Sequence, residues 1–295
     1  MMIDAHTHLF SPAVVADRTR YAECDSFFDC LYRNPKARIV GAAELIAAMD
    51  AAGVDKAVVV GWPWQSNDVC IEQNTWLMEV TRQYPNRLIA LCTVQPNAGA
   101  TAIRELRRCI ENGMAGAGEL NADGQGFQLD DVGFLNLARA AVELHKPLML
   151  HTNEPVGHSY PGNGQLSLAA IYALVKALPD LRLVLAHWGG GFPFYELMPE
   201  VRQASQNVFY DTAASPLLYT PKIFRTVVHI VGVDKVLFGS DFPLLLYPRR
   251  QKEPDMRPFL DEVRGVGLVA EEFAKVLGEN AERVFGRGDL KQGTD

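Results

Sequence analysis

Eight short apolar segments recur along the chain, and stretches with helical periodicity separate them. The segments span 3–5, 56–61, 88–94, 115–120, 147–151, 183–187, 208–211 and 235–241. The helical stretches between them include 69–84, 100–112, 132–144, 166–178, 194–205 and 221–231. Continuous apolar runs are typical of strands that are buried on both faces of a parallel sheet. Eight such strands in 295 residues fit a single (β/α)8 (TIM) barrel, an α/β fold, better than an open doubly wound sheet.

We expect one domain over residues 1–295, with two additions to the barrel. Residues 9–40 follow the first strand as an irregular insertion that carries several aromatic and arginine side chains. Long loops of this kind are often lids or binding loops, and an insertion that only packs over the barrel mouth fits the same pattern. Residues 286–295 follow the last helical stretch, at 280–285, and are expected to form a C-terminal tail.

Charge and composition argue against several classes of function. The net charge of −7 comes without a basic stripe, so a nucleic-acid-binding surface is not expected. No apolar run reaches the roughly 18 residues of a membrane span, and no secretory signal pattern precedes the first strand. The five cysteines lack Cys-x-x-Cys spacing, which predicts reduced thiols in a cytoplasmic protein rather than disulfides or a thiolate metal site.

Titratable residues fall at the carboxyl ends of the expected strands. In a (β/α)8 barrel these ends meet at one face, where the active sites of this fold lie. Each residue alone is compatible with a structural hydrogen bond or a turn cap. Their joint position predicts a metal centre, because imidazole and carboxylate groups bind divalent metals. We expect the ligands to come from His6, His8, Glu119, His151, His187 and Asp241.

These residues stand in motifs that resemble those of the amidohydrolase superfamily of metal-dependent barrels. The motifs are Asp4-Ala5-His6-Thr7-His8, Gly118-Glu119, Leu150-His151, Ala186-His187 and Gly239-Ser240-Asp241-Phe242-Pro243. More narrowly, the chain looks like the amidohydrolase-related branch, which includes aminocarboxymuconate-semialdehyde decarboxylase and pyrone-dicarboxylate lactonase. The resemblance covers nearly the whole chain, and its motifs specify the superfamily rather than a substrate.

The resemblance implies roles for the six residues. The histidines of the first and fifth strands are ligands, and Asp241 binds metal while it handles the proton of a bound water. His187 is a catalytic residue in mononuclear decarboxylases and a ligand of the second ion in binuclear relatives. Glu119 resembles the bridging ligand of TatD-like binuclear hydrolases. The expected cofactor is one or two divalent ions, with zinc expected first and manganese, iron or nickel as alternatives.

Three functions fit this pattern. The first expectation is a hydrolase that uses a metal-activated water to cleave an ester, lactone or amide bond of a small organic substrate. The alternative is a nonoxidative decarboxylase of a small unsaturated or aromatic carboxylic acid. A metal-binding barrel without catalysis is the third, since fold alone does not fix function. Asp241 argues against the third function, because a site that only binds metal needs no acid–base group.

Side chains that follow the strands are candidates for substrate contact. Aromatic and polar groups at the mouth of a barrel are typical of a site for a small organic molecule. Packing of the barrel mouth explains the two tryptophans after the second strand equally well. The candidates are Trp62, Trp64, Asn153, Trp188 and Arg249, the last as a possible partner of a substrate carboxylate. The family resemblance also makes a homodimer plausible.

Overall fold

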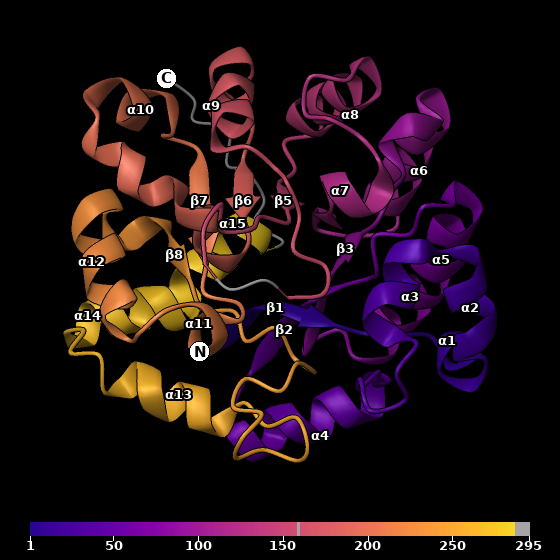
Figure 1. Cartoon of the computed structure of the whole chain (residues 1–295), viewed down its shortest axis with the longest axis horizontal. Coiled ribbons are helices and arrows are strands. Elements are labelled where there is room, and N and C mark those ends of the chain that lie inside the picture. The colour runs from indigo at the N-terminus through magenta and orange to yellow at the C-terminus, as the bar shows by residue number, and fades with distance from the viewer. Residues whose placement is uncertain (158–159, 287–295) are drawn as a thin grey trace.

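The computed structural model describes residues 1–157 and 160–286. Eight parallel strands pair in chain order, from β1 to β8, and helices surround them (Figure 1). This arrangement confirms the predicted (β/α)8 barrel. The strands are β1 (Ile3–His8), β2 (Lys56–Val60), β3 (Leu88–Cys92), β4 (Gly116–Leu120), β5 (Leu148–Leu150), β6 (Leu183–Leu185), β7 (Val208–Asp211) and β8 (Val236–Leu237).

The barrel closes between β1 and the segment that follows β8. The Ala5 amide donates to the Phe238 carbonyl at 2.7 Å, and the His8 amide donates to the Phe242 carbonyl at the same distance. The Asp241 amide donates in turn to the His6 carbonyl at 2.9 Å. Strand β8 is therefore shorter than the expected 235–241, because only its first residues pair with β7 and the rest bond to β1.

The outer layer consists of helices whose apolar faces pack against the strands. The longer ones are α4 (Ala42–Ala52), α5 (Asn67–Gln83), α6 (Ala100–Glu111), α8 (Val132–Glu143), α9 (Leu168–Ala177), α12 (Lys222–Val231) and α13 (Arg257–Arg264). Shorter helices are α7 (Ala122–Gln125), α10 (Pro199–Ala204), α11 (Ser215–Leu218), α14 (Ala270–Ala274) and α15 (Asn280–Phe285). Between strands and helices lies the main apolar core, and a smaller core fills the barrel interior with residues such as Ile3, Val58 and Leu237.

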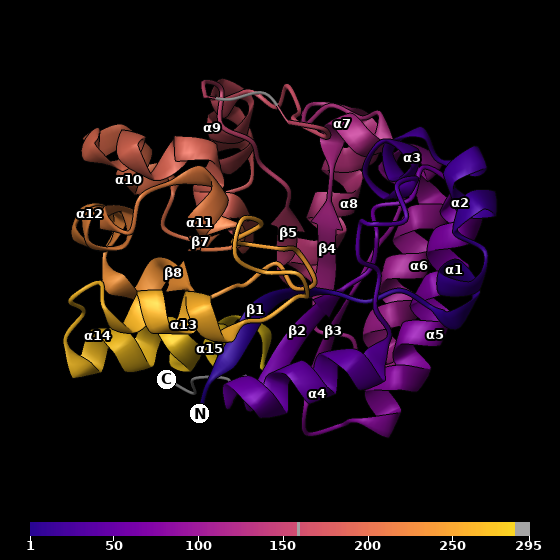
Figure 2. The ribbon, with the colours of Figure 1, turned by 60° about the horizontal axis from the view of Figure 1, so that its bottom comes forward.

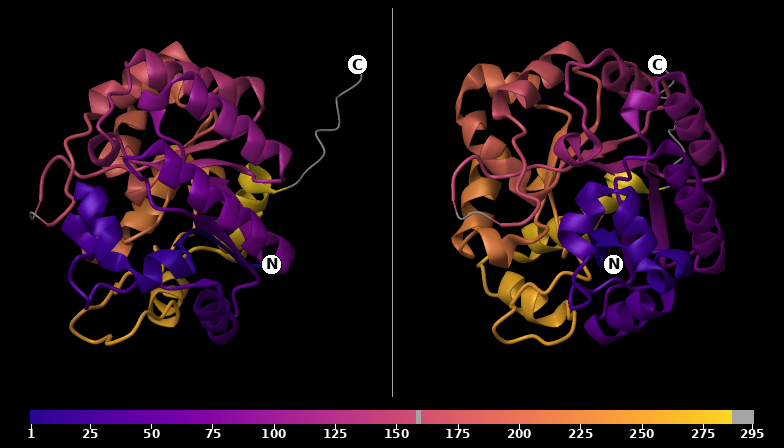
Figure 3. Two further views of the ribbon diagram at one scale, coloured as in Figure 1. Left: turned by 90° about the vertical axis from the view of Figure 1, so that its right-hand side faces the viewer. Right: turned by 45° about the vertical axis from the view of Figure 1, so that its right-hand side comes forward.

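The insertion after β1 is helical, so the expectation of an irregular stretch over 9–40 was wrong. It forms α1 (Pro12–Ala16), α2 (Arg18–Cys24) and α3 (Ser26–Tyr32), which lie beside α5 (Figures 2 and 3). The side chains of Ser11, Asp17 and Asp25 cap these helices, so each begins despite its short length. Their aromatic residues pack on the segment after β2, in a cluster of Phe10, Tyr21, Phe28, Trp62 and Trp64.

Two further expectations need correction. The helix expected over 194–205 is only α10, because a 3₁₀ segment, η2 (His187–Leu197), precedes it with left-handed residues from Trp188 to Gly191. Helix α13, which follows β8 after a long loop, was not predicted. The expected C-terminal tail lies outside the described residues from position 287 onward. Over the described part of the chain, no helix has both the length and the apolar character to cross a bilayer.

Candidate metal centre

Strand β1 brings two imidazoles to one point of the barrel. The rings of His6 and His8 lie with their centroids 5.0 Å apart, as expected for residues two apart on a strand. Their Nε2 atoms are 3.1 Å apart. Both side chains are buried, with 0% exposure for His6 and 7% for His8. Two ring nitrogens at this separation suit a shared cation, because each offers a lone pair to the same point.

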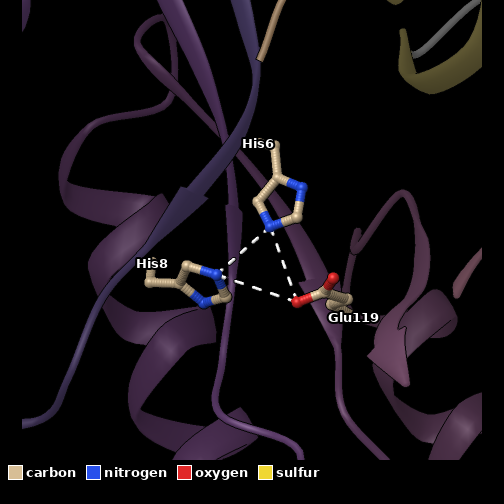
Figure 4. A group of neighbouring side chains, drawn as sticks. All are labelled: His6, His8 and Glu119. Carbon is tan, nitrogen blue, oxygen red and sulfur yellow. Dashed lines mark hydrogen bonds and ion pairs between the residues drawn. The ribbon is translucent and has the colours of Figure 1, made fainter. Parts of the chain in front are cut away.

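Carboxylates from β4 and from the segment after β8 complete a first donor group, and Figure 4 shows the β4 carboxylate, Glu119, beside His6 and His8. Glu119 Oε2 lies 3.6 Å from His6 Nε2 and 3.8 Å from His8 Nε2. Asp241 Oδ1 lies 3.1 Å from His8 Nε2 and 3.7 Å from His6 Nε2. The structure thus brings together His6, His8, Glu119 and Asp241, as the sequence predicted.

A second donor group lies on the other oxygen of the same glutamate. Glu119 Oε1 is 2.8 Å from His151 Nδ1 and 3.2 Å from His187 Nε2. These two ring nitrogens are 3.1 Å apart. Glu119 therefore stands between the two groups, with one oxygen toward each. The bridging role that the resemblance implies for Glu119 stays a prediction.

The donor atoms fit divalent cations in type and in spacing. Ligand atoms held about 2.0–2.2 Å from one ion lie about 2.8–3.6 Å apart in tetrahedral or octahedral geometry. The separations given above run from 2.8 Å to 3.8 Å, and all but the two longest, at 3.7 Å and 3.8 Å, fall within the range expected around one ion. Imidazole nitrogen and carboxylate oxygen are borderline-to-hard donors that suit zinc, manganese, iron and nickel. Each group of three, His6–His8–Glu119 and Glu119–His151–His187, can accordingly hold a metal ion.

The barrel closes where β1 meets the segment after β8, and we call this contact the barrel seam. Close packing there places Asp241 next to the imidazoles. Gly239 lies so near β1 that an added Cβ would sit 2.8 Å from the Cβ of His6. The buried Asp4 carboxylate accepts from the Ser240 amide at 2.9 Å and from the His6 amide at 3.1 Å. The chain then turns through a left-handed residue, Asp241, at φ 63°. A side chain at position 239 would disturb this arrangement.

Neighbouring charges shift the pKa values of His6 and Asp241 in the first donor group. Burial disfavours a protonated His6, but the Asp211 and Glu119 carboxylates outweigh burial and raise the pKa of His6 well above its usual range. Burial opposes ionisation of Asp241, yet the His8 hydrogen bond and the neighbouring imidazoles lower its pKa. Both carboxylates of the group are therefore ionised at neutral pH, as metal binding requires.

In the second donor group, too, neighbouring charges outweigh the effect of burial on the pKa values. Burial would raise the pKa of Glu119, but His151 and His6 reverse this effect and lower it well below its ordinary value. Burial would lower the pKa of His187, and the hydrogen bond and charge of Glu119, with the charge of Asp241, raise it to about 9. Without a metal, His187 therefore carries a proton at neutral pH.

The structure brings only some of the expected substrate residues to the site. Asn153 does lie there, with Nδ2 donating to His151 Nε2 at 3.1 Å. Trp62 and Trp64 belong to the aromatic cluster under the insertion. Trp188 has no exposed surface: its indole N–H donates to Ser215 Oγ at 2.9 Å, so it packs in the core and not at the site. Arg249 is exposed on the loop after β8.

Two residues near the site escaped the sequence analysis. Asp211 ends β7 and accepts from His6 Nδ1 at 2.9 Å; its place at a strand end was the signal that could have found it. Tyr32 ends α3 and stacks against Phe28 with ring centroids 5.1 Å apart. Burial raises the pKa of Tyr32, and so do the negative charges of Asp241 and Glu119. The insertion therefore places a phenol within the electrostatic reach of the donor groups.

Comparisons with known proteins point to one family. The amidohydrolase family model matches residues 3–287. The 2-amino-3-carboxymuconate-6-semialdehyde decarboxylase of Dictyostelium discoideum is 24% identical in an alignment 216 residues long that covers 62% of this chain and 59% of that protein. The alignment thus spans less than two thirds of that relative's length.

Solved structures with the same fold include two 5-carboxyvanillate decarboxylases. The enzyme from Sphingomonas paucimobilis superposes with a TM-score of 0.78 at 19% identity, over 96% of this chain and 98% of that one. The enzyme from Novosphingobium aromaticivorans, complexed with manganese and 4-hydroxy-3-methoxy-5-nitrobenzoic acid, gives a TM-score of 0.75 at 20% identity, over 97% and 96%. At these identities the similarity shows the fold.

These three relatives are all named as decarboxylases, whereas the first expectation from the sequence was a hydrolase. The family model covers nearly the whole chain, including every residue of both donor groups. The predicted resemblance is thereby confirmed, and the chain belongs to the amidohydrolase family.

Proposed function

We propose that this protein is a nonoxidative decarboxylase of a small aromatic or unsaturated carboxylic acid and that it depends on a divalent metal. One observation carries the proposal: His187 Nε2 lies 3.2 Å from Glu119, a member of the first donor group, and the pKa of His187 is raised to about 9. A proton donor next to a cation is the pair that decarboxylation needs. The names of the relatives support the same reaction.

In the reaction, the bond between the substrate carbon and its carboxylate breaks, CO₂ leaves, and the carbon takes up one proton. A bound divalent cation would supply positive charge for the oxygens of the substrate. His187 donates the proton from Nε2, the atom that faces Glu119 Oε1 at 3.2 Å. Glu119 keeps His187 protonated before the reaction, and Asp241 remains ionised. Tyr32 offers a hydrogen bond to a polar group of the substrate.

The number and identity of the ions are part of the proposal. The first donor group has four donors and is the primary site. A second ion on Glu119, His151 and His187 would consume the proton donor, so we propose that the active form holds one ion per chain. Manganese is the first metal to test, because a structural neighbour is complexed with it, and zinc is the second. We also propose that the protein forms a homodimer and is located in the cytoplasm. Gel filtration tests the dimer, and cell fractionation tests the location.

Hydrolysis is the second candidate, and the position of Glu119 favours it. A carboxylate with one oxygen on each donor group suits two ions and a water between them. Under this alternative His187 is a ligand and does not donate a proton. The two functions therefore differ in the number of ions that support full activity.

The test measures metal content and CO₂ release together. Metal-free protein is titrated with Mn²⁺ or Zn²⁺ and assayed with 5-carboxyvanillate and a set of hydroxybenzoates, then with lactones, esters and amides. We expect CO₂ release to reach its maximum at one ion per chain. His187→Ala should abolish release, whereas His229→Ala, which removes an exposed histidine of α12, should leave it unchanged. Hydrolysis that needs two ions would refute the decarboxylase proposal.

A further inference from the structure

Asp211 offers no ligand to either donor group, yet it contacts both. Its side chain is completely buried at the end of β7. One oxygen, Oδ2, lies 2.9 Å from His6 Nδ1. The other, Oδ1, accepts the backbone N–H of His187 at 2.9 Å and that of Ala213 at 3.0 Å. One carboxylate thus joins a histidine of the first group to a histidine of the second.

The contact with His6 decides which ring nitrogen is free. An ionised carboxylate can only accept hydrogen bonds, so Nδ1 must carry the hydrogen. When the ring is neutral, the lone pair is then on Nε2, the atom that faces His8 and Glu119. Carboxylates that orient a ligating imidazole in this way raise its basicity and fix its angle.

The contact with His187 acts through the main chain. His187 has a left-handed backbone, at φ 57°, which is uncommon for a residue with a side chain. Asp211 holds its N–H and also holds the amide of Ala213. The Ala213 carbonyl lies 3.2 Å from His187 Nδ1, so Nδ1 donates there and Nε2 is directed toward Glu119. The orientation of both rings therefore depends on Asp211.

We propose that Asp211 is a positioning residue that fixes the ring tautomer of His6 directly and the ring orientation of His187 through Ala213, so that both Nε2 atoms face the donor groups. This inference rests on the metal centre of the proposed function. It adds a carboxylate that neither binds metal nor touches substrate, and without which the first donor group loses one of its imidazoles.

Asp211→Asn tests the proposal with almost no change in shape. The asparagine oxygen must stay on the Oδ1 side, because turning the amide would leave two backbone N–H groups facing an NH₂. The NH₂ then faces His6 Nδ1, which must become the acceptor. The hydrogen moves to Nε2 and removes its lone pair from the centre. We expect Mn²⁺ and Zn²⁺ affinity, measured by calorimetry, to fall about 10- to 100-fold.

Asp25→Asn is the matched control. Asp25 is also a buried carboxylate that accepts two backbone amides, but one on each oxygen: Phe28 on Oδ1 at 2.7 Å and Gln65 on Oδ2 at 2.8 Å. Asp25→Asn therefore disturbs its own backbone contacts at least as much as Asp211→Asn does, while these contacts involve no histidine. It should leave metal affinity within about twofold of wild type. In a His6→Ala background, Asp211→Asn should have little further effect, because its target is gone. An equal loss of affinity in both backgrounds would overturn the proposal.

Nitrogen NMR of the zinc-loaded wild type gives a readout that does not depend on any variant. Long-range ¹H–¹⁵N correlations should show His6 with a protonated Nδ1 and a metal-bound Nε2; the reverse assignment would overturn the proposal. If the wild type binds metal and folded Asp211→Asn binds it equally well, only the role of Asp211 fails. If the wild type binds no metal at saturation, the proposed function fails with it.

Discussion

Gly239→Ala adds one methyl group at the barrel seam and should weaken metal binding without touching a ligand. The new Cβ would lie 2.8 Å from the Cβ of His6, and ordinary contact begins at 3.4 Å, so about 0.6 Å must be absorbed. Backbone lies on both sides: the same Cβ would be 3.4 Å from the His6 amide and 3.6 Å from that of Ala213. The methyl group can therefore be accommodated only by moving β1 or the segment after β8.

A movement of this size matters because metal sites tolerate about 0.2 Å in ligand distance. We expect Mn²⁺ affinity to fall about 10- to 100-fold, which is about 1.4–2.7 kcal/mol. Overpacking of a closely packed core should also lower the free energy of unfolding by about 1–3 kcal/mol. Calorimetry with Mn²⁺ measures the first effect, and urea unfolding with chelator present measures the second.

Gly41→Ala is the control, because a Cβ there would meet nothing within 4 Å. Its backbone, at φ −94°, accepts an alanine without strain. If Gly239→Ala binds Mn²⁺ as tightly as Gly41→Ala does, the added methyl group does not displace the ligands and the prediction is wrong. A loss of stability with unchanged metal affinity would mean that the barrel seam accommodates the methyl group without moving His6.

Three further predictions follow from the site. Glu119→Gln removes a buried carboxylate from between the imidazoles and should lower the free energy of unfolding of metal-free protein by about 3–5 kcal/mol; unchanged urea unfolding with chelator would contradict this. The pKa of His187 is raised from 6.5 to about 9, so its stabilising contribution in metal-free protein is complete below pH 6.5 and is lost as pH rises through 9. The thermal midpoint with chelator should therefore fall over that range, whereas His187→Ala should remove this part of the pH dependence. Tyr32→Phe keeps the ring stack on Phe28 but removes the phenol, so KM for an active phenolic acid should rise up to about tenfold with an unchanged thermal midpoint; an unchanged KM would exclude substrate contact.

The sequence could predict that these side chains meet, because strand topology alone places them together. His6, His8 and Asp241 meet wherever parallel strands close into a barrel, and no side-chain detail is needed. Asp211 was missed for the opposite reason. It ends a strand as the ligands do, but only the twist of the barrel decides whether its carboxylate faces a ring nitrogen or a metal.

The sequence pattern also failed to predict the short helices of the insertion and the course of η2. Helices of five to seven residues are too short to show a periodicity, and their caps and aromatic contacts decide their formation. The run from Trp188 to Gly191 adopts left-handed angles that a helical pattern does not reveal. In both places tertiary packing outweighs local preference.

The closure of the barrel has a consequence for how the protein is made. Asp4 and Ser240 are hydrogen-bonded across 236 residues of chain, so the two halves of the first donor group leave the ribosome far apart in time. At about 5–20 residues per second, His6 and His8 wait on the order of 10–50 seconds before Asp241 is synthesised. A nascent chain therefore cannot build the complete four-donor group until the segment after the last strand has been synthesised.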